Sequence, residues 1–191
     1  MQYSFYFDQS RCTGCCTCLI ACKDWHENDI GSEPSNWIKV NTIEKGRFPD
    51  LSVSFLFITC LHCAYPPCIP ACPVGAIKKR EEDGIVVIDR GICLGIENCE
   101  GFCQAACAYQ APEFGSQPDA KMQKCDFCLD RWAQGKMPIC IEGCPMRALD
   151  AGPLDELKTK YGKIQAAEGF VYSEKAKPSI VFKLKRQGGG V

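Results

Sequence analysis

The chain has 191 residues and a formal net charge of −1, and its apolar (46%) and charged (24%) fractions allow a buried core and argue against wholesale disorder. The near-neutral charge gives no electrostatic reason to expect nucleic acid as a partner. Cysteine is the outlier, with 17 residues. An odd count in a chain of this length, with no signal-peptide pattern after Met1, argues against a disulfide scaffold and favours thiolates that bind metal.

The predicted secondary-structure elements are short. In the first third of the chain the patterns indicate one strand, one helical turn and two further strands joined by a turn, over residues 3–7, 18–26, 37–43 and 51–58. The Asp83-Gly84 pair predicts a hairpin between strands at 76–77 and 85–88. A helix is expected to start at Pro153 and to end at Gly162, followed by a last strand at 178–185 and a flexible end at 188–190.

The expected fold class is therefore α+β, rich in loops and organised around metal rather than around long helices. No run approaches 18 uninterrupted apolar residues, so no membrane-spanning segment is predicted.

Sixteen of the cysteines fall into four runs of four along the chain. The runs are Cys12, Cys15, Cys18 and Cys22; Cys60, Cys63, Cys68 and Cys72; Cys93, Cys99, Cys103 and Cys107; and Cys125, Cys128, Cys140 and Cys144. The first run has the spacing Cys-x2-Cys-x2-Cys-x3-Cys that places one thiolate on each iron of [4Fe–4S] clusters. The others are widened versions that all end in x3-Cys, and two of them are followed by proline.

This pattern predicts four [4Fe–4S] clusters whose iron ligands are these sixteen cysteines. Two alternatives stay open at single runs. The cysteine pairs of the fourth run also suit zinc, and the strongly widened third run could carry another cluster type.

The remaining candidates are weaker. Cys16 is interpreted as a small side chain packed beside a cluster, and His26 as a surface histidine. His62 lies between two predicted ligands, so it is either an ordinary loop histidine, which we favour, or a donor to a cluster sulfur. No Ser/His/Asp arrangement, P-loop or dinucleotide fingerprint occurs, and no catalytic residue is predicted.

The motifs around the cysteines resemble those of one family, the four-cluster iron–sulfur (B) subunit of the dimethyl sulfoxide reductase family of molybdenum or tungsten oxidoreductases. The resemblance covers roughly residues 3–162. It rests above all on Cys12-Thr-Gly-Cys15, Cys72-Pro73-Val-Gly75-Ala76, Lys124-Cys125-Asp126-Phe-Cys128 and Cys144-Pro145-Met-Arg147-Ala148. The third run departs from the family pattern, because both of its loops are widened and Ala108 replaces a proline.

The resemblance implies two interleaved ferredoxin-like modules, at about 1–50 plus 110–165 and at 51–109, with a C-terminal tail at 166–191. It also implies crossed ligation. In that scheme Cys144 joins the first three cysteines of the first run, Cys22 joins those of the fourth, Cys107 those of the second and Cys72 those of the third. From the spacings alone, a pairing of neighbouring runs stays equally open.

The resemblance further implies a non-catalytic subunit of anaerobic respiration. It would relay electrons between a large molybdopterin catalytic subunit and a membrane anchor that handles quinone, or a soluble acceptor. Such a subunit is held at the membrane, on either side, through its partners. The alternative is a free-standing soluble polyferredoxin, which would purify without a large partner.

Overall fold

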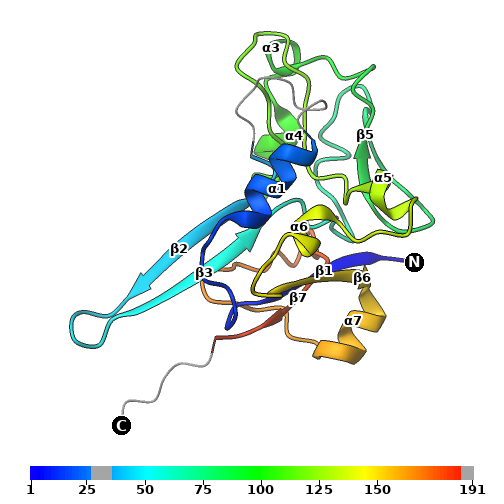
Figure 1. The fold of residues 1–191 in the computed structure, drawn as a ribbon. Helices are drawn as coiled ribbons and strands as arrows, with labels where there is room; N and C mark the ends of the chain where they lie inside the picture. Colours follow the sequence, from blue (N-terminus) through cyan, green and yellow to red (C-terminus); the bar gives the residue numbers. More distant parts are fainter. Residues whose placement is uncertain (27–35, 186–191) are drawn as a thin grey trace.

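The computed structural model describes residues 1–26 and 36–185, and the expected flexible end at 188–190 lies outside them. Within these ranges, thirteen short helices and strands are connected by long loops (Figure 1). The strands form a three-stranded sheet with the order β6-β1-β7 and two separate two-stranded hairpins. The mixture of helices and strands is as expected, while the ferredoxin-like α+β class and its division into two modules stay predictions.

The three-stranded sheet is built around β1 (Tyr3–Asp8), which pairs antiparallel with β6 (Leu149–Pro153) and parallel with β7 (Ile180–Lys183). Its Phe5 and Phe7 face the largest core of the molecule. Tyr6 faces the other side, where α7 (Leu154–Tyr161) covers the sheet. Both faces of the strand are therefore buried, and β7, from the expected tail, completes the sheet.

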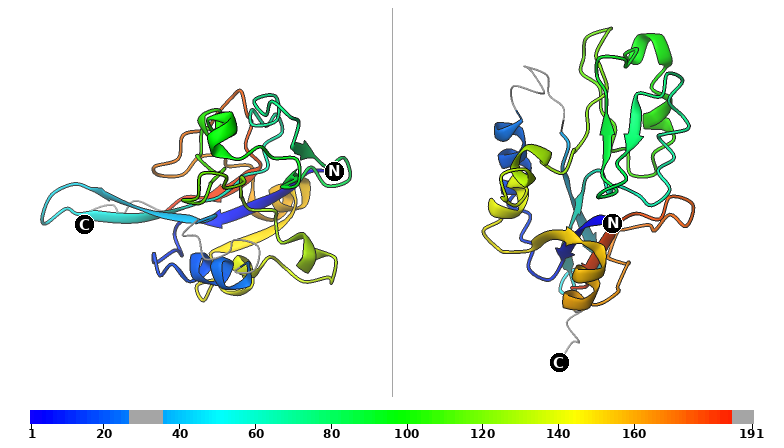
Figure 2. Two further views of the ribbon diagram at one scale, coloured as in Figure 1. Left: turned by 90° about the horizontal axis from the view of Figure 1, so that it is seen from above. Right: turned by 90° about the vertical axis from the view of Figure 1, so that its right-hand side faces the viewer.

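The two hairpins lie where the sequence predicts them. The first joins β2 (Lys39–Lys45) to β3 (Ser52–Ile58), and its tip extends away from the body of the molecule (Figure 2). The second joins β4 (Ile77–Lys79) to β5 (Val86–Ile88), with Gly84 at a φ of 71° in the turn. Ile77 and Val86 contribute to a smaller second core around Met122.

The helices are short, and all of them except α7 contain a cysteine or directly follow one. They are α1 (Thr17–Trp25), α3 (Ile96–Cys99), α4 (Phe102–Ala105), α5 (Leu129–Trp132) and α6 (Ile139–Glu142), besides α7. The predicted helix at α7 is confirmed, with Pro153 before its first residue and Gly162 after its last. Across the described ranges, no helix is long and apolar enough to cross a membrane.

Candidate metal centres

The structure brings the sixteen cysteines together in four groups, and each group combines distant parts of the chain. The first group is Cys12, Cys15, Cys18 and Cys144, which line one cavity between the loop before α1 and the turn after α6. The volume of this cavity is about 370 Å³, including the part that opens to solvent. Burial, and after it the charges of Cys12 and Cys144, raises the pKa of the Cys18 thiol to about 12.

The second group consists of Cys22, Cys125, Cys128 and Cys140, all of them buried. It lies where α1 meets the segment around α5 and α6. Burial, and then the charges of Cys125, Cys128 and Cys22, raises the pKa of Cys140 well above its ordinary value. The pKa of Cys125 is likewise raised well above its ordinary value, by burial and then by the charges of Cys128 and Cys22.

The third group consists of Cys60, Cys63, Cys68 and Cys107. Burial raises the pKa of Cys63 to about 12, followed by the charges of Cys60, Cys107 and Cys68. The pKa of Cys68 is raised to about 12 by burial and by the same neighbours Cys60 and Cys107.

The fourth group is Cys72, Cys93, Cys99 and Cys103, which line a second cavity of about 310 Å³, again including the part that opens to solvent. Here the widened loops of the sequence have a structural use. The widened loops contain most of α3 and the first residue of α4, and these two helices carry Cys99 and Cys103 to the cavity wall. Burial, and then the charges of Cys99 and Cys72, raises the pKa of Cys103 to about 11.

The four groups follow one another in a line. Cys18 of the first group is near enough to raise the pKa of Cys22 in the second group, after the larger effect of burial. Cys60 of the third group likewise contributes to the raised pKa of Cys125 in the second group. Cys103 of the fourth group contributes to the raised pKa of Cys68 in the third. In both cases burial is the largest cause.

The chemistry of this donor set fits iron–sulfur clusters. None of the seventeen cysteines forms a disulfide, and buried thiols with raised pKa values do not ionise at neutral pH without a compensating positive charge. A bound metal supplies that charge and deprotonates a coordinating thiol. Four soft sulfur donors in each group match what a [4Fe–4S] cluster requires.

Backbone conformation repeats around these cysteines. Gly14, His62 and Phe127 each precede the second cysteine of a Cys-x2-Cys pair, and all three have positive φ, at 70°, 42° and 67°. Only glycine adopts this left-handed region at little cost. The conformation turns backbone N–H groups toward sulfur, as where the Phe127 N–H lies 3.4 Å from Cys125 Sγ.

A second repeat follows the cysteine that ends a run. Gly75, Gln110 and Arg147 stand three residues after Cys72, Cys107 and Cys144, and their φ values are 63°, 49° and 50°. The next residue is alanine each time. The N–H groups of Ala76 and Ala148 lie 3.3 Å and 3.4 Å from the preceding cysteine sulfurs, and that of Ala111 hydrogen-bonds Cys107.

Two lysines place positive charge close to the second and third groups. Lys124 is buried, and its ammonium donates hydrogen bonds to the carbonyl oxygens of Val86 and Cys125. Lys79 donates to the carbonyl oxygens of Cys63 (2.7 Å) and Ala64 (3.1 Å). These cations partly offset the negative charge that the thiolates of the second and third groups carry when they bind metal.

The structure corrects one interpretation and refines two. His26, expected at the surface, is only 2% exposed, because it packs against Trp37 where the second group meets the core. His62 is a loop residue as favoured, but it is fully buried and its Nδ1 accepts the Val86 N–H at 3.0 Å. Cys16 lines the cavity of the first group at a φ of 58°.

Comparison with known proteins also indicates an iron–sulfur protein. Residues 51–154 match the family model described as a 4Fe-4S dicluster domain. The chain is 42% identical to the B subunit of anaerobic dimethyl sulfoxide reductase from Escherichia coli over 95% of its own length and 88% of the relative. The corresponding B subunit from Haemophilus influenzae is 39% identical over 95% and 89%. Protein NrfC of Escherichia coli is 33% identical over 86% and 71%.

Proposed function

The protein belongs to the family of iron–sulfur electron-transfer subunits that includes the B subunit of anaerobic dimethyl sulfoxide reductase, and on this basis we propose that its four cysteine groups hold four [4Fe–4S] clusters. The proposed ligands are Cys12, Cys15, Cys18 and Cys144; Cys22, Cys125, Cys128 and Cys140; Cys60, Cys63, Cys68 and Cys107; and Cys72, Cys93, Cys99 and Cys103.

The observation that carries this assignment is the crossed grouping of the cysteines. In each group the last cysteine of one run joins the first three of another, as where Cys144 shares a cavity with Cys12, Cys15 and Cys18. A cubic cluster needs one thiolate for each of its four irons, and each group supplies four thiols.

We further propose that electrons pass along the line of groups, between a molybdopterin-type catalytic subunit at one end and a membrane anchor at the other. A [4Fe–4S] cluster supplies one-electron redox chemistry when bound. The protein's own part is to hold the sites in sequence and to place backbone N–H groups and the buried Lys124 beside them. These features set the reduction potential of each site.

The test is iron and acid-labile sulfide on anaerobically purified protein, expected at about sixteen of each per chain. Cys15→Ala and Cys16→Ala form a matched pair, since the two neighbours line the same cavity but only Cys15 is a proposed ligand. Cys15→Ala should lower the iron content by between about one and four atoms per chain, and Cys16→Ala should leave it unchanged. Equal losses from both variants, or stoichiometric zinc in place of iron, would contradict the assignment.

A further inference from the structure

The second group lacks one element that the other three groups share. In those groups the cysteine that ends a run receives a hydrogen bond from the alanine N–H four residues later. After Cys22, α1 continues instead, and the residue four positions on is His26. Its N–H donates to the carbonyl oxygen of Cys22 at 3.1 Å, as in a helix, so it is not directed at the sulfur.

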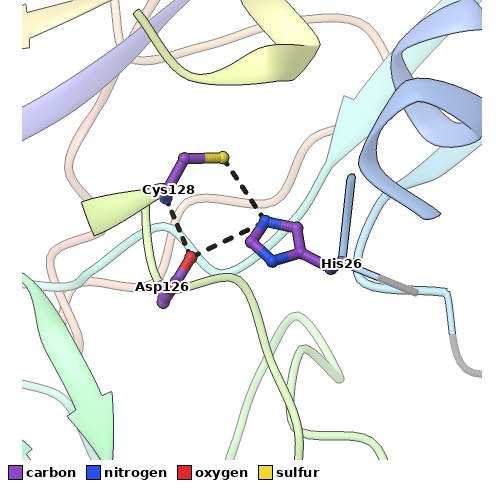
Figure 3. Close-up of side chains that lie close together, drawn as sticks. All are labelled: His26, Asp126 and Cys128. Atoms are coloured by element: carbon purple, nitrogen blue, oxygen red, sulfur yellow. Dashed lines mark hydrogen bonds and ion pairs between the residues drawn. The ribbon is translucent and has the colours of Figure 1, made fainter. Parts of the chain in front are cut away.

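The side chain of His26 turns toward the same group (Figure 3). Its Nε2 lies 3.5 Å from Cys128 Sγ, within hydrogen-bonding distance for sulfur, and 3.9 Å from Asp126 Oδ1. The side chain is only 3% exposed. Little water therefore reaches this contact to compete for the imidazole.

The surroundings decide which atom donates. Asp126 Oδ1 already accepts the N–H of Cys128 at 2.8 Å, so both neighbours of the His26 Nε2 are acceptors. A lone pair at Nε2 would face a carboxylate and a cluster thiolate, and this repulsion selects the tautomer with hydrogen on Nε2.

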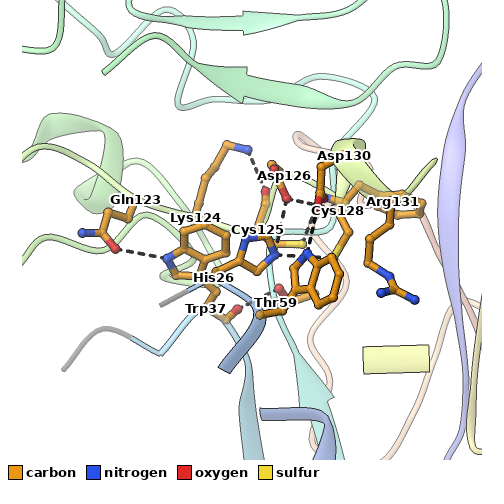
Figure 4. A network of polar contacts seen from close by, with 12 residues as sticks. His26, Trp37, Thr59, Gln123, Lys124, Cys125, Asp126, Cys128, Asp130 and Arg131 are labelled. Carbon is orange, nitrogen blue, oxygen red and sulfur yellow. Dashed lines mark hydrogen bonds and ion pairs between the residues drawn. The ribbon is translucent and has the colours of Figure 1, made fainter. Parts of the chain in front are cut away.

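The ring is also held in place (Figure 4). It packs against the indole of Trp37, with 4.6 Å between ring centroids. Trp37 is fixed in turn by hydrogen bonds from its Nε1 to Gln123 Oε1 (3.4 Å) and from Thr59 Oγ1 to its carbonyl oxygen (2.7 Å). Such support keeps the imidazole oriented toward the sulfur.

We propose that His26 is a positioning residue for the second group. Its Nε2–H donates a hydrogen bond to the Cys128 sulfur and thereby raises the reduction potential of the cluster that Cys22, Cys125, Cys128 and Cys140 hold. Reduction adds negative charge that is shared with the thiolates, so a donor at sulfur stabilises the reduced state more than the oxidised state. The inference rests on the proposed function, because it requires Cys128 to be a cluster ligand.

The test compares His26→Phe, which keeps a ring against Trp37 but removes the donor, with His26→Gln, which keeps an N–H donor. Potentials are measured by redox titration of the whole protein, followed by electron paramagnetic resonance. In His26→Phe one of the four potentials should fall, with about a tenfold loss in its reduction equilibrium constant, or about 59 mV for one electron. His26→Gln should retain most of the original potential.

A second measurement does not depend on the assembly of His26→Phe. The chain has two histidines, and His62 lies between the proposed ligands Cys60 and Cys63, so a coupling seen after ¹⁵N-histidine labelling is assigned by comparison with His26→Gln. Pulsed electron paramagnetic resonance of the reduced wild-type protein should detect a histidine nitrogen coupled to a cluster spin, and this coupling should be absent from His26→Gln. If His26→Phe loses iron, this measurement decides the question.

The inference is overturned by four unchanged potentials in a His26→Phe protein with full iron content, or by histidine nitrogen couplings in His26→Gln that are identical to those of the wild-type protein. An upward shift of the potential would also overturn it. If the wild-type protein itself contains far fewer than about sixteen iron atoms per chain, the proposed function fails instead, and the two failures are thereby distinguished.

Discussion

At the scale of single residues, the sites depend on a few backbone positions in the left-handed region. Gln110 is one of them. Its φ of 49° lets the next N–H, that of Ala111, reach the Cys107 sulfur. A residue with a side chain adopts this conformation at a cost of about 1–2 kcal/mol, which the surrounding structure must offset. The position is therefore set by backbone geometry rather than by the glutamine side chain, which is exposed.

This view predicts opposite outcomes for two substitutions at Gln110. Gln110→Gly should leave the stability within about 1 kcal/mol of wild type, because relief of the backbone strain offsets the greater freedom of the unfolded chain. Gln110→Val should destabilise the protein by about 1–3 kcal/mol, because a β-branched residue resists positive φ. Anaerobic thermal unfolding with iron analysis measures both. A glycine variant that is less stable than the valine variant would contradict the explanation.

The spacings singled out the sixteen cysteines, and the family resemblance implied how they group, but neither indicated these left-handed positions. A glycine signals such a position, as at Gly14 and Gly75, whereas Phe127, Gln110 and Arg147 carry no local signal. They could have been found only by aligning the runs with one another, since each occupies the place that glycine holds in another run. His26 was misassigned for a related reason, because a polar residue at a helix end gives no sign that the metal sites bury it.

At the scale of elements, one part of the scaffold lies away from the metal sites. Helix α7 packs on the side of the sheet away from the largest core, where Leu157 is 4% exposed and contacts Tyr6 and Val181. The same helix holds Tyr161, whose ring stacks on that of Tyr6 at 3.6 Å. This small core packs against the face of β1 opposite the largest core, and it contains no cysteine.

Leu157→Ala should therefore weaken the fold without emptying a site. Removing a buried leucine side chain costs about 2–5 kcal/mol, so the unfolding temperature should fall clearly. The iron content of the purified protein at low temperature should stay equal to that of wild type. Loss of iron in proportion to the loss of stability would mean that the sheet and the metal sites form one cooperative unit.

Element prediction succeeded where the signal was local and failed where it was not. The hairpins β2-β3 and β4-β5 follow from alternating residues and turn signals, and α7 follows from Pro153 and Gly162. Strand β6 was missed, because Leu149-Asp-Ala-Gly-Pro contains poor strand formers. It forms because β1 needs hydrogen-bond partners on both edges, a tertiary requirement that no local pattern expresses.

At the scale of the whole molecule, the crossed grouping makes one structure out of the entire chain. Cys22 and Cys144 each join cysteines more than a hundred residues away in sequence, as Cys144 does with Cys12 in the first cavity. Cluster binding therefore closes long loops, and it does so in a fold with small sheets and short helices. Assembly of the groups and folding of the chain should be coupled, as in other small metalloproteins.

The linear order of the groups leads to a last prediction. If the second group lies between the first and the third, a variant that empties it should isolate the first. Cys22→Ser removes one proposed ligand of the second group and leaves the other three groups with all theirs. In the fully reduced wild-type protein, neighbouring clusters should broaden one another's electron paramagnetic resonance signals.

In Cys22→Ser the signal of the first group should narrow, because the cluster of the second group, which lies next to Cys18, is lost. The third and fourth groups should stay coupled, because Cys68 and Cys103 still connect them. Cys72→Ser, at the other end of the line, is the matched control and should leave the first group coupled. In a Cys22→Ser protein that has lost about four iron atoms per chain, a first-group signal that stays broad would place another cluster beside the first group and would exclude a linear path for electrons.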